Sequence, residues 1–206
     1  MQIAEVRTAG ILVRHLGLAE YEPTLQAMRA FTAQRADVSA DEIWLLEHPQ
    51  VYTLGQGAEA RSVHNGIPLV RSDRGGEITY HGPGQIVLYA LIDLARRGIK
   101  VKRFVWMLEQ AVIDLLGGRG ERKPGAPGVY ADGAKIAALG IRVSRGRAYH
   151  GVALNVDMDL SPFAAIDPCG YPGLAVTDMR CLGFSESPDV MGEKLVKTFT
   201  ARLENA

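Results

Sequence analysis

The sequence has few cysteines, no long hydrophobic run and no excess of charge of either sign. Among its 206 residues are two cysteines, Cys169 and Cys181, too few for a disulfide framework. No apolar run reaches the roughly 18 residues that a transmembrane helix needs. The N-terminus also lacks the basic and apolar regions of a secretory signal peptide. We therefore expect a cytoplasmic protein with reduced thiols and no membrane association.

The charge balance and the scattered histidines exclude two further classes of site. The 23 basic and 23 acidic side chains cancel, so the chain shows no basic footprint for nucleic acid. The five histidines follow no C-x-x-C or H-E-x-x-H pattern, so we expect no metal site.

Apolar periodicity predicts many strands and about three helices, in no strict alternation. The run over residues 85–94 predicts a central strand that is buried on both faces. Asp132-Gly133 indicates a tight hairpin, whereas 121–128 reads as a rigid loop. The class is therefore α+β: a mixed β-sheet with packed helices, in a single domain over 1–206. Helices are expected over 21–37, 101–118 and 187–203, and further strands over 11–16, 42–48, 51–55, 69–72, 77–82, 128–131, 134–143 and 148–156.

Two glycine-rich stretches are candidate ligand sites. The stretch over 55–60 resembles a loose dinucleotide fingerprint, but no helix pattern follows it, so it predicts only a turn. The segment from Arg74 to His81 places Gly75 and Gly76 before a short strand, which lets backbone amides approach a ligand closely. The alternative is an ordinary hairpin in which His81 is a structural hydrogen-bonding residue.

Lys135 opens the strand after the predicted hairpin turn. If side chains alternate cleanly, Lys135 shares a face with Ala137, Leu139 and Ile141. A lysine on an apolar face loses solvation, which lowers its pKa and suits it to accept a proton from a thiol or to pair with a thiolate. The alternative is a strand-end lysine that extends into water.

Cys169 lies in the sequence DPCGYPG, where prolines and glycines hold a loop with no helix or strand pattern. Isolated cysteines are usually small buried apolar residues, and that interpretation suits Cys181 better than Cys169. A fixed, accessible thiol beside backbone amides meets the needs of a nucleophile with an oxyanion pocket. Cys169 is therefore the candidate nucleophile.

Several long motifs together resemble the octanoyltransferases of lipoate biosynthesis. They are RGGEITYHGPGQ, LYALIDL, PGVYADGAKIAALGIRV, YHGVALNVDMDLSPF and IDPCGYPG, and they occur in the order of the family. YEPTLQAM and DEIWLLEHPQVYTLGQ fit its N-terminal half, so the resemblance covers about residues 10 to 185.

The resemblance implies the catalytic fold of biotin– and lipoate–protein ligases, with a core over roughly 30–206. It implies octanoyl transfer from octanoyl-acyl carrier protein to a lysine of lipoyl domains, those of 2-oxoacid dehydrogenases and of the glycine cleavage H protein, without a cofactor. It assigns an acyl-thioester to Cys169 and an assisting role to Lys135. The implied acyl-site residues are Arg74, Gly75, Gly76, Glu77, Ile78, Thr79, Tyr80, His81, Ala138, Leu139, Gly140, Gly151, Val152 and Ala153.

Two alternatives remain open from the sequence. An ATP-dependent lipoate or biotin ligase on the same fold would need an adenylate-binding loop and no nucleophilic cysteine. A non-catalytic module that binds acyl carrier protein would bind its partner without turnover.

Overall fold

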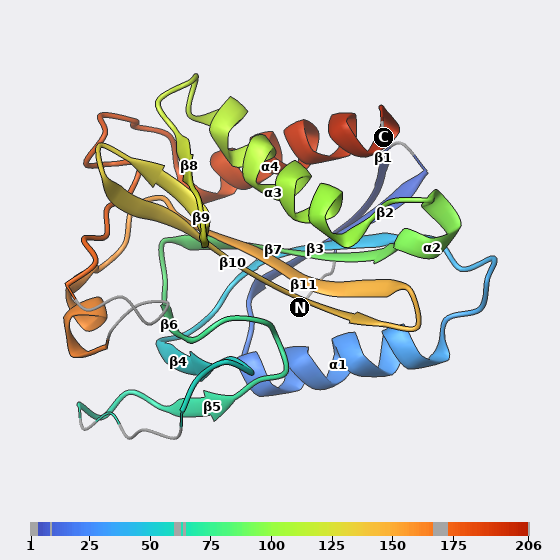
Figure 1. Cartoon of the computed structure of the whole chain (residues 1–206), viewed down its shortest axis with the longest axis horizontal. Helices are drawn as coiled ribbons and strands as arrows, with labels where there is room; N and C mark the ends of the chain where they lie inside the picture. The colour runs from blue at the N-terminus through green and yellow to red at the C-terminus, as the bar shows by residue number, and fades with distance from the viewer. Residues whose placement is uncertain (1–3, 9, 60–62, 64, 167–172, 206) are drawn as a thin grey trace.

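A computed structural model of the chain describes residues 4–8, 10–59, 63, 65–166 and 173–205. Its centre is an eight-stranded mixed sheet with the order β1-β2-β3-β7-β11-β10-β9-β8 (Figure 1). β2 and β3 are parallel, and the other neighbours are antiparallel. The strands are β1 (Ala4–Thr8), β2 (Ile11–Leu18), β3 (Glu42–Glu47), β7 (Gln85–Asp93), β8 (Glu121–Lys123), β9 (Ala126–Ala131), β10 (Ala134–Ser144) and β11 (Arg147–Asn155).

Helices cover both faces of this sheet, and a smaller sheet lies on one of them. Figure 1 shows α3 and α4 on one face and α1 on the other, with β4, β5 and β6 on the α1 side. The small sheet has the order β5-β4-β6. Its strands are β4 (Val51–Leu54), β5 (Leu69–Arg71) and β6 (Ile78–His81). The helices are α1 (Tyr21–Gln34), the short α2 (Leu94–Arg97), α3 (Val101–Leu115) and α4 (Pro188–Glu204), with a 3₁₀ turn at Ser161–Ala165.

β7 separates the two apolar layers. Every residue of this strand is buried, which confirms the predicted central strand. Leu88 and Ala90 join the cluster beneath α3 and α4, whereas Tyr89 and Leu91 pack with α1. Alternate side chains of one strand therefore fill two cores, as expected when both faces of a sheet are covered.

The structure departs from the sequence-based expectations mainly at short edge strands. β1 was not predicted from the sequence. The expected rigid loop over 121–128 is wrong, because these residues form β8 and the start of β9. The two strands are joined by a hairpin turn at Gly125, whose φ is +78°. The hairpin at Asp132-Gly133 is confirmed: both residues have positive φ, as a type I′ turn requires. Ser187 also caps α4 as predicted, accepting a hydrogen bond from Val190 N–H.

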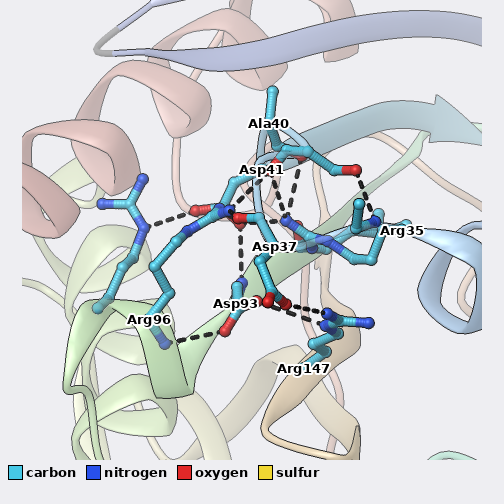
Figure 2. Close-up of polar contacts among 11 residues, drawn as sticks. Arg35, Asp37, Ala40, Asp41, Asp93, Arg96 and Arg147 are labelled. Atoms are coloured by element: carbon cyan, nitrogen blue, oxygen red, sulfur yellow. Dashed lines mark hydrogen bonds and ion pairs between the residues drawn. The ribbon is translucent and has the colours of Figure 1, made fainter.

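A buried carboxylate anchors the loop between α1 and β3 (Figure 2). Asp41 Oδ1 accepts hydrogen bonds from Arg35 Nη2 at 2.6 Å and from Arg96 Nη2 at 2.8 Å, and Asp41 Oδ2 accepts one from Arg97 Nε at 2.6 Å. The backbone N–H of Asp93 also donates to it. Burial raises the pKa of Asp41, but these hydrogen bonds outweigh burial and hold the pKa below its usual range.

Replacing Asp41 with Asn should destabilise the fold in a pH-dependent way. Removing one partner of a buried ion cluster leaves uncompensated charge, so Asp41→Asn is expected to lower the free energy of unfolding at pH 7 by about 3 kcal/mol. Because the folded-state pKa is depressed, the contribution of Asp41 is present above the unfolded pKa of about 3.9 and is lost as the pH falls through the lower folded-state value. Urea unfolding at a series of pH values measures both effects.

Asp37→Asn is the matched control for this prediction. Asp37 also pairs with an arginine, Arg147, but its side chain is 99% exposed. Its replacement should change the unfolding free energy by no more than about 0.5 kcal/mol. Equal losses in the two variants would contradict the role assigned to Asp41.

Among the described residues, no helix is long and apolar enough to cross a membrane. Within the same part of the chain, no group of three or more His, Cys, Asp or Glu side chains is placed to hold a metal ion.

Candidate active site

A cavity lies between the α1-facing side of the main sheet and the small sheet. The empty space between its walls is about 460 Å³, which includes open solvent at its mouth. Both polar and apolar residues line it, from α1, β6, β7, β10, β11 and the segment before β6: Tyr21, Arg74, Gly76, Glu77, Thr79, His81, Val87, Tyr89, Ala138, Leu139, Gly140, His150, Gly151, Val152 and Ala153.

The burial of these residues distinguishes the mouth from the floor of the cavity. Gly76 is exposed, and Ala138, Leu139 and Gly140 are half-buried, so the cavity opens between the 74–77 segment and β10. The residues from β7 and β11 are buried and form its floor. A half-buried mouth over a buried floor suits a slender apolar ligand.

The roof of the cavity is the segment Arg74–Glu77, which crosses β10 in close contact. Gly75 N–H donates to the carbonyl oxygen of Ile141 at 3.0 Å. A Cβ atom on Gly140 would lie 2.8 Å from the carbonyl oxygen of Gly75, so only glycine permits this approach. Arg74 is buried and donates through Nη2 to the carbonyl oxygen of Thr53 at 2.6 Å, which fixes the segment to β4.

A chain of hydrogen bonds runs from the cavity to Lys135. His81 Nδ1 lies 2.7 Å from Gln85 Oε1, and Gln85 Nε2 donates to Asn155 Oδ1 at 2.9 Å. Asn155 Nδ2 donates to the carbonyl oxygen of Thr177 at 2.9 Å, and Thr177 N–H donates to that of Lys135 at 3.0 Å. The orientation of the His81 ring is therefore tied to the strand that carries Lys135.

Lys135 is buried at the start of β10. The residue is only 3% exposed, and its Nζ donates a hydrogen bond to the carbonyl oxygen of Pro127 at 3.1 Å. The alternative of a lysine that extends into water is therefore wrong. The expectation that side chains alternate cleanly between the two faces of this strand is also wrong. A β-bulge between Lys135 and Ala137 shifts the register, and the consecutive residues Ile136 and Ala137 both belong to the same apolar cluster.

A second groove extends the cavity toward Lys135. It is lined by Gly75, Gly76, Glu77, Val105, Gly125, Pro127, Leu139, Gly140 and Ile141. It shares Gly76 and Leu139 with the cavity, and Pro127 provides the carbonyl that Lys135 Nζ contacts. The two hollows thus adjoin at residues 76–77 and at Leu139 and Gly140.

Cys169 lies outside the described residues. The segment that follows it in sequence pairs with Lys135: Lys135 N–H donates to the carbonyl oxygen of Ala175 at 2.8 Å, and Val176 forms a parallel bridge to Lys135. The chain therefore passes directly beside Lys135 six residues after the candidate nucleophile.

The histidines around the cavity are held neutral. Burial lowers the pKa of His81 well below its usual value, helped by His48 and Arg74, and burial also lowers the pKa of His150. Burial raises the pKa of Asp73, but hydrogen bonds from His150, Tyr149 and Arg29 outweigh it and hold the pKa below its usual range. At neutral pH the cavity is thus lined by uncharged imidazoles.

Several cavity residues were not singled out from the sequence. They are Tyr21, Val87, Tyr89 and His150. One sequence feature could have pointed to His150, because the tripeptide Tyr-His-Gly occurs twice, ending at Gly82 and at Gly151. Both of its histidines line the cavity.

Some predicted residues lie elsewhere. Ile78 and Tyr80 face away from the cavity and pack with Phe163, and Gly75 lines only the adjoining groove. The interpretation of Cys181 as a buried residue is wrong, because it lies in an exposed turn after Met179. A hydrogen bond with Asp178 raises the pKa of its thiol.

The fold is that of lipoate– and biotin–protein ligases. A lipoate-protein ligase A bound with ATP aligns with a TM-score of 0.74 at 17% identity, covering 93% of this chain and 84% of that one. A biotin protein ligase from Aquifex aeolicus aligns with a TM-score of 0.55 at 11% identity, covering 94% and 68% of the two chains. The predicted fold class is therefore confirmed.

Sequence comparison places the chain within one family of that fold. Residues 20–200 match the model of the lipoyl protein ligase A/B catalytic domain. An octanoyltransferase of Aromatoleum aromaticum is 59% identical over 92% of this chain and 84% of its own length, and one of Dechloromonas aromatica is 53% identical over 94% and 97%. The chain belongs to the lipoyl protein ligase A/B catalytic family and, within it, to the octanoyltransferases. It is an acyltransferase, as the sequence motifs predicted.

The effect of burial on the histidines can be tested on His48, which lies behind the cavity and packs against the lining residues Tyr21 and His81. Its Nδ1 bonds the carbonyl oxygen of Ala19, and its Nε2 bonds the hydroxyl of Tyr89 at 2.7 Å. Burial lowers the pKa of His48 to about 4. In an NMR titration of the folded protein, we expect the His48 imidazole signals to stay constant from neutral pH to about pH 5, and in urea to titrate near the unperturbed value of about 6.5. A folded-state midpoint near that of the unfolded chain would contradict the assignment.

Proposed function

We propose that this enzyme moves an octanoyl group from octanoyl-acyl carrier protein to a lysine of a lipoyl domain, through a thioester on Cys169. The observation that carries the proposal is the apolar cavity, which adjoins a groove leading to a buried lysine beside the segment that follows the PCG motif. Membership of the octanoyltransferases supports the acyl group and the reaction class.

The cavity provides the binding energy for the acyl chain. Most of its surface is apolar, and the half-buried mouth at Ala138–Gly140 admits a chain from the side of Lys135. Burying six methylenes at about 0.8 kcal/mol each gives roughly 5 kcal/mol before the entropy of ordering the chain is subtracted. That is enough to hold the chain in place while its carbonyl reacts.

Lys135 promotes the first half-reaction. It accepts the proton of the Cys169 thiol or pairs with the thiolate, which attacks the carbonyl carbon of the donor thioester. The bond from carbon to the Cys169 sulfur forms as the bond to the carrier sulfur breaks. The carrier leaves as a thiol once it receives the proton.

Backbone amides stabilise the negative oxygen that develops in this step. Gly75, Gly76 and Gly170 are the candidates from the sequence. The N–H of Gly75 already donates to Ile141, which favours the other two.

In the second half-reaction the target lysine attacks the acyl-enzyme. Its ammonium group must first lose a proton, which Lys135 or His81 accepts. An amide bond forms, and Cys169 leaves as a thiol. Exchange between thioesters is nearly isoenergetic and amide formation from a thioester is downhill, so the reaction needs no ATP.

Mixing the enzyme with octanoyl-acyl carrier protein, without nucleotide, should add one octanoyl group to the protein. Peptide mass spectrometry is expected to map the adduct to Cys169. Adding an unmodified lipoyl domain should then discharge the adduct and leave an octanoyl amide on that domain.

Matched cysteine variants make this test specific. Cys181→Ser should form the adduct as the wild type does, whereas Cys169→Ser should form none. Transfer that survives in Cys169→Ser and requires ATP would instead identify a ligase. Binding of the carrier with neither adduct nor turnover would identify a binding module.

Replacing Lys135 with Met should make the Cys169 thiol less acidic. Met keeps the length and apolar stem of lysine but offers neither a base nor a positive charge. We expect the rate of alkylation by iodoacetamide, followed against pH, to move at least one pH unit higher, about 1.4 kcal/mol of lost preference for the thiolate.

This measurement needs a background without Cys181, because that thiol is exposed and would also react. Comparing Cys181→Ser with the double variant Cys181→Ser, Lys135→Met isolates the effect on Cys169. If the two alkylation profiles coincide, Lys135 does not activate the thiol.

A further inference from the structure

His150 occupies the end of the cavity that lies farthest from Lys135 along the strands. The pairing of β10 with β11 sets Ala138 opposite Ala153, Gly140 opposite Gly151, and Ile141 opposite His150. Six residues separate Lys135 from Ile141, roughly 20 Å of strand. Along these two strands the cavity is lined from Ala138 and Ala153, at the end nearer Lys135, to the His150 imidazole, whose residue is 1% exposed.

Two unfavourable features are retained at this one residue. The backbone of His150 has φ +61°, in the left-handed region, although it lies within a strand. Its Nδ1 is buried with no hydrogen-bond partner among the described residues. Backbone strain and an unsatisfied buried polar atom both cost stability, and such features persist mostly where function requires them.

Hydrogen bonds fix the imidazole rigidly despite these costs. His150 Nε2 donates to Asp73 Oδ1 at 2.8 Å. The other oxygen of Asp73 accepts from the hydroxyl of Tyr149 at 2.6 Å and from Arg29 Nε at 2.9 Å. The ring also stacks on Tyr149 and meets Tyr89 edge-on. A ring held on three sides cannot turn aside for a longer ligand.

We propose that His150 is a specificity-determining residue that closes the acyl cavity and limits the acyl chain to about eight carbons. The proposal rests on the proposed function. An octanoyl chain has seven carbon–carbon bonds of about 1.5 Å, so it spans less than about 10 Å. The lining of the cavity along β11 runs from Ala153 to His150, three residue steps or roughly 10 Å of strand, which matches the length of this chain. Two more methylenes would press on a ring that its partners hold in place, and rigid cores resist such overpacking.

The alternative role for a carboxylate-oriented imidazole is that of a general base. A base must lie within hydrogen-bond reach of the proton that it removes. His150 lies opposite Ile141, six residues along β10 from Lys135, which is too far for it to take a proton at Lys135. Its place in the fold thus favours a role in chain length.

The test shortens this side chain with residues that suit its backbone. Glycine adopts positive φ without strain, and asparagine tolerates it, so His150→Gly and His150→Asn should both fold. The measurement is kcat/KM for octanoyl-, decanoyl- and dodecanoyl-acyl carrier protein. We expect the ratio of decanoyl to octanoyl transfer to rise at least tenfold in His150→Gly, and less in His150→Asn.

Arg145→Gly is the matched control. Arg145 is also a non-glycine residue with positive φ, 49°, but it lies in the exposed turn between β10 and β11. Its replacement relieves the same kind of backbone strain without altering the cavity. The chain-length ratio of this variant should equal that of the wild type.

Binding of free octanoate, decanoate and dodecanoate, measured by calorimetry, tests the cavity separately from catalysis. A preference that moves to longer acids in His150→Gly would support the proposal even if the wild type transferred no acyl group, in which case only the proposed function would fail. Unchanged chain-length ratios in both assays would overturn the proposal. Transfer that falls equally for all chain lengths, with a shifted pH profile, would overturn it in favour of a base.

Discussion

The candidate site depends on one close crossing of two backbones, where the Arg74–Glu77 segment passes over β10. The hydrogen bond from Gly75 N–H to the carbonyl oxygen of Ile141 holds the crossing, and Gly140 leaves room for it. This crossing makes the roof of the cavity, and the same segment also lines the adjoining groove. A side chain at Gly140 would lie 2.8 Å from the carbonyl oxygen of Gly75, so the crossing segment would have to shift.

Polar groups are numerous around a cavity that we propose binds an apolar chain, and burial explains how the two are compatible. The imidazoles are neutral because burial disfavours their charged forms, and their ring nitrogens are largely engaged with neighbours such as Gln85 and Asp73. Such rings present flat, uncharged faces of fixed orientation. They provide rigidity that a cavity lined by flexible aliphatic side chains would lack.

The sequence predicted the parts of the fold that local patterns determine. The buried run at 85–94, the Asp132-Gly133 turn and the Ser187 cap each carry their own signal, and each is confirmed. β1 and β8 were missed because short edge strands carry little periodicity. Of the candidate site, the glycine-rich segment was visible, whereas Tyr21, Tyr89 and His150 were not, because contacts between distant strands bring them there. The bulge after Lys135 likewise arises from pairing with β9, which no local pattern encodes.

The bridge between Lys135 and the 175–177 segment is made by backbone atoms alone. Substitution of the side chains of Ala175, Val176 or Thr177 therefore leaves its hydrogen bonds in place. The pairing of β10 at Lys135 with residues 175–177 is thus expected to persist when these side chains are substituted. The side chains of this segment can therefore vary while its backbone pairing beside Lys135 is kept.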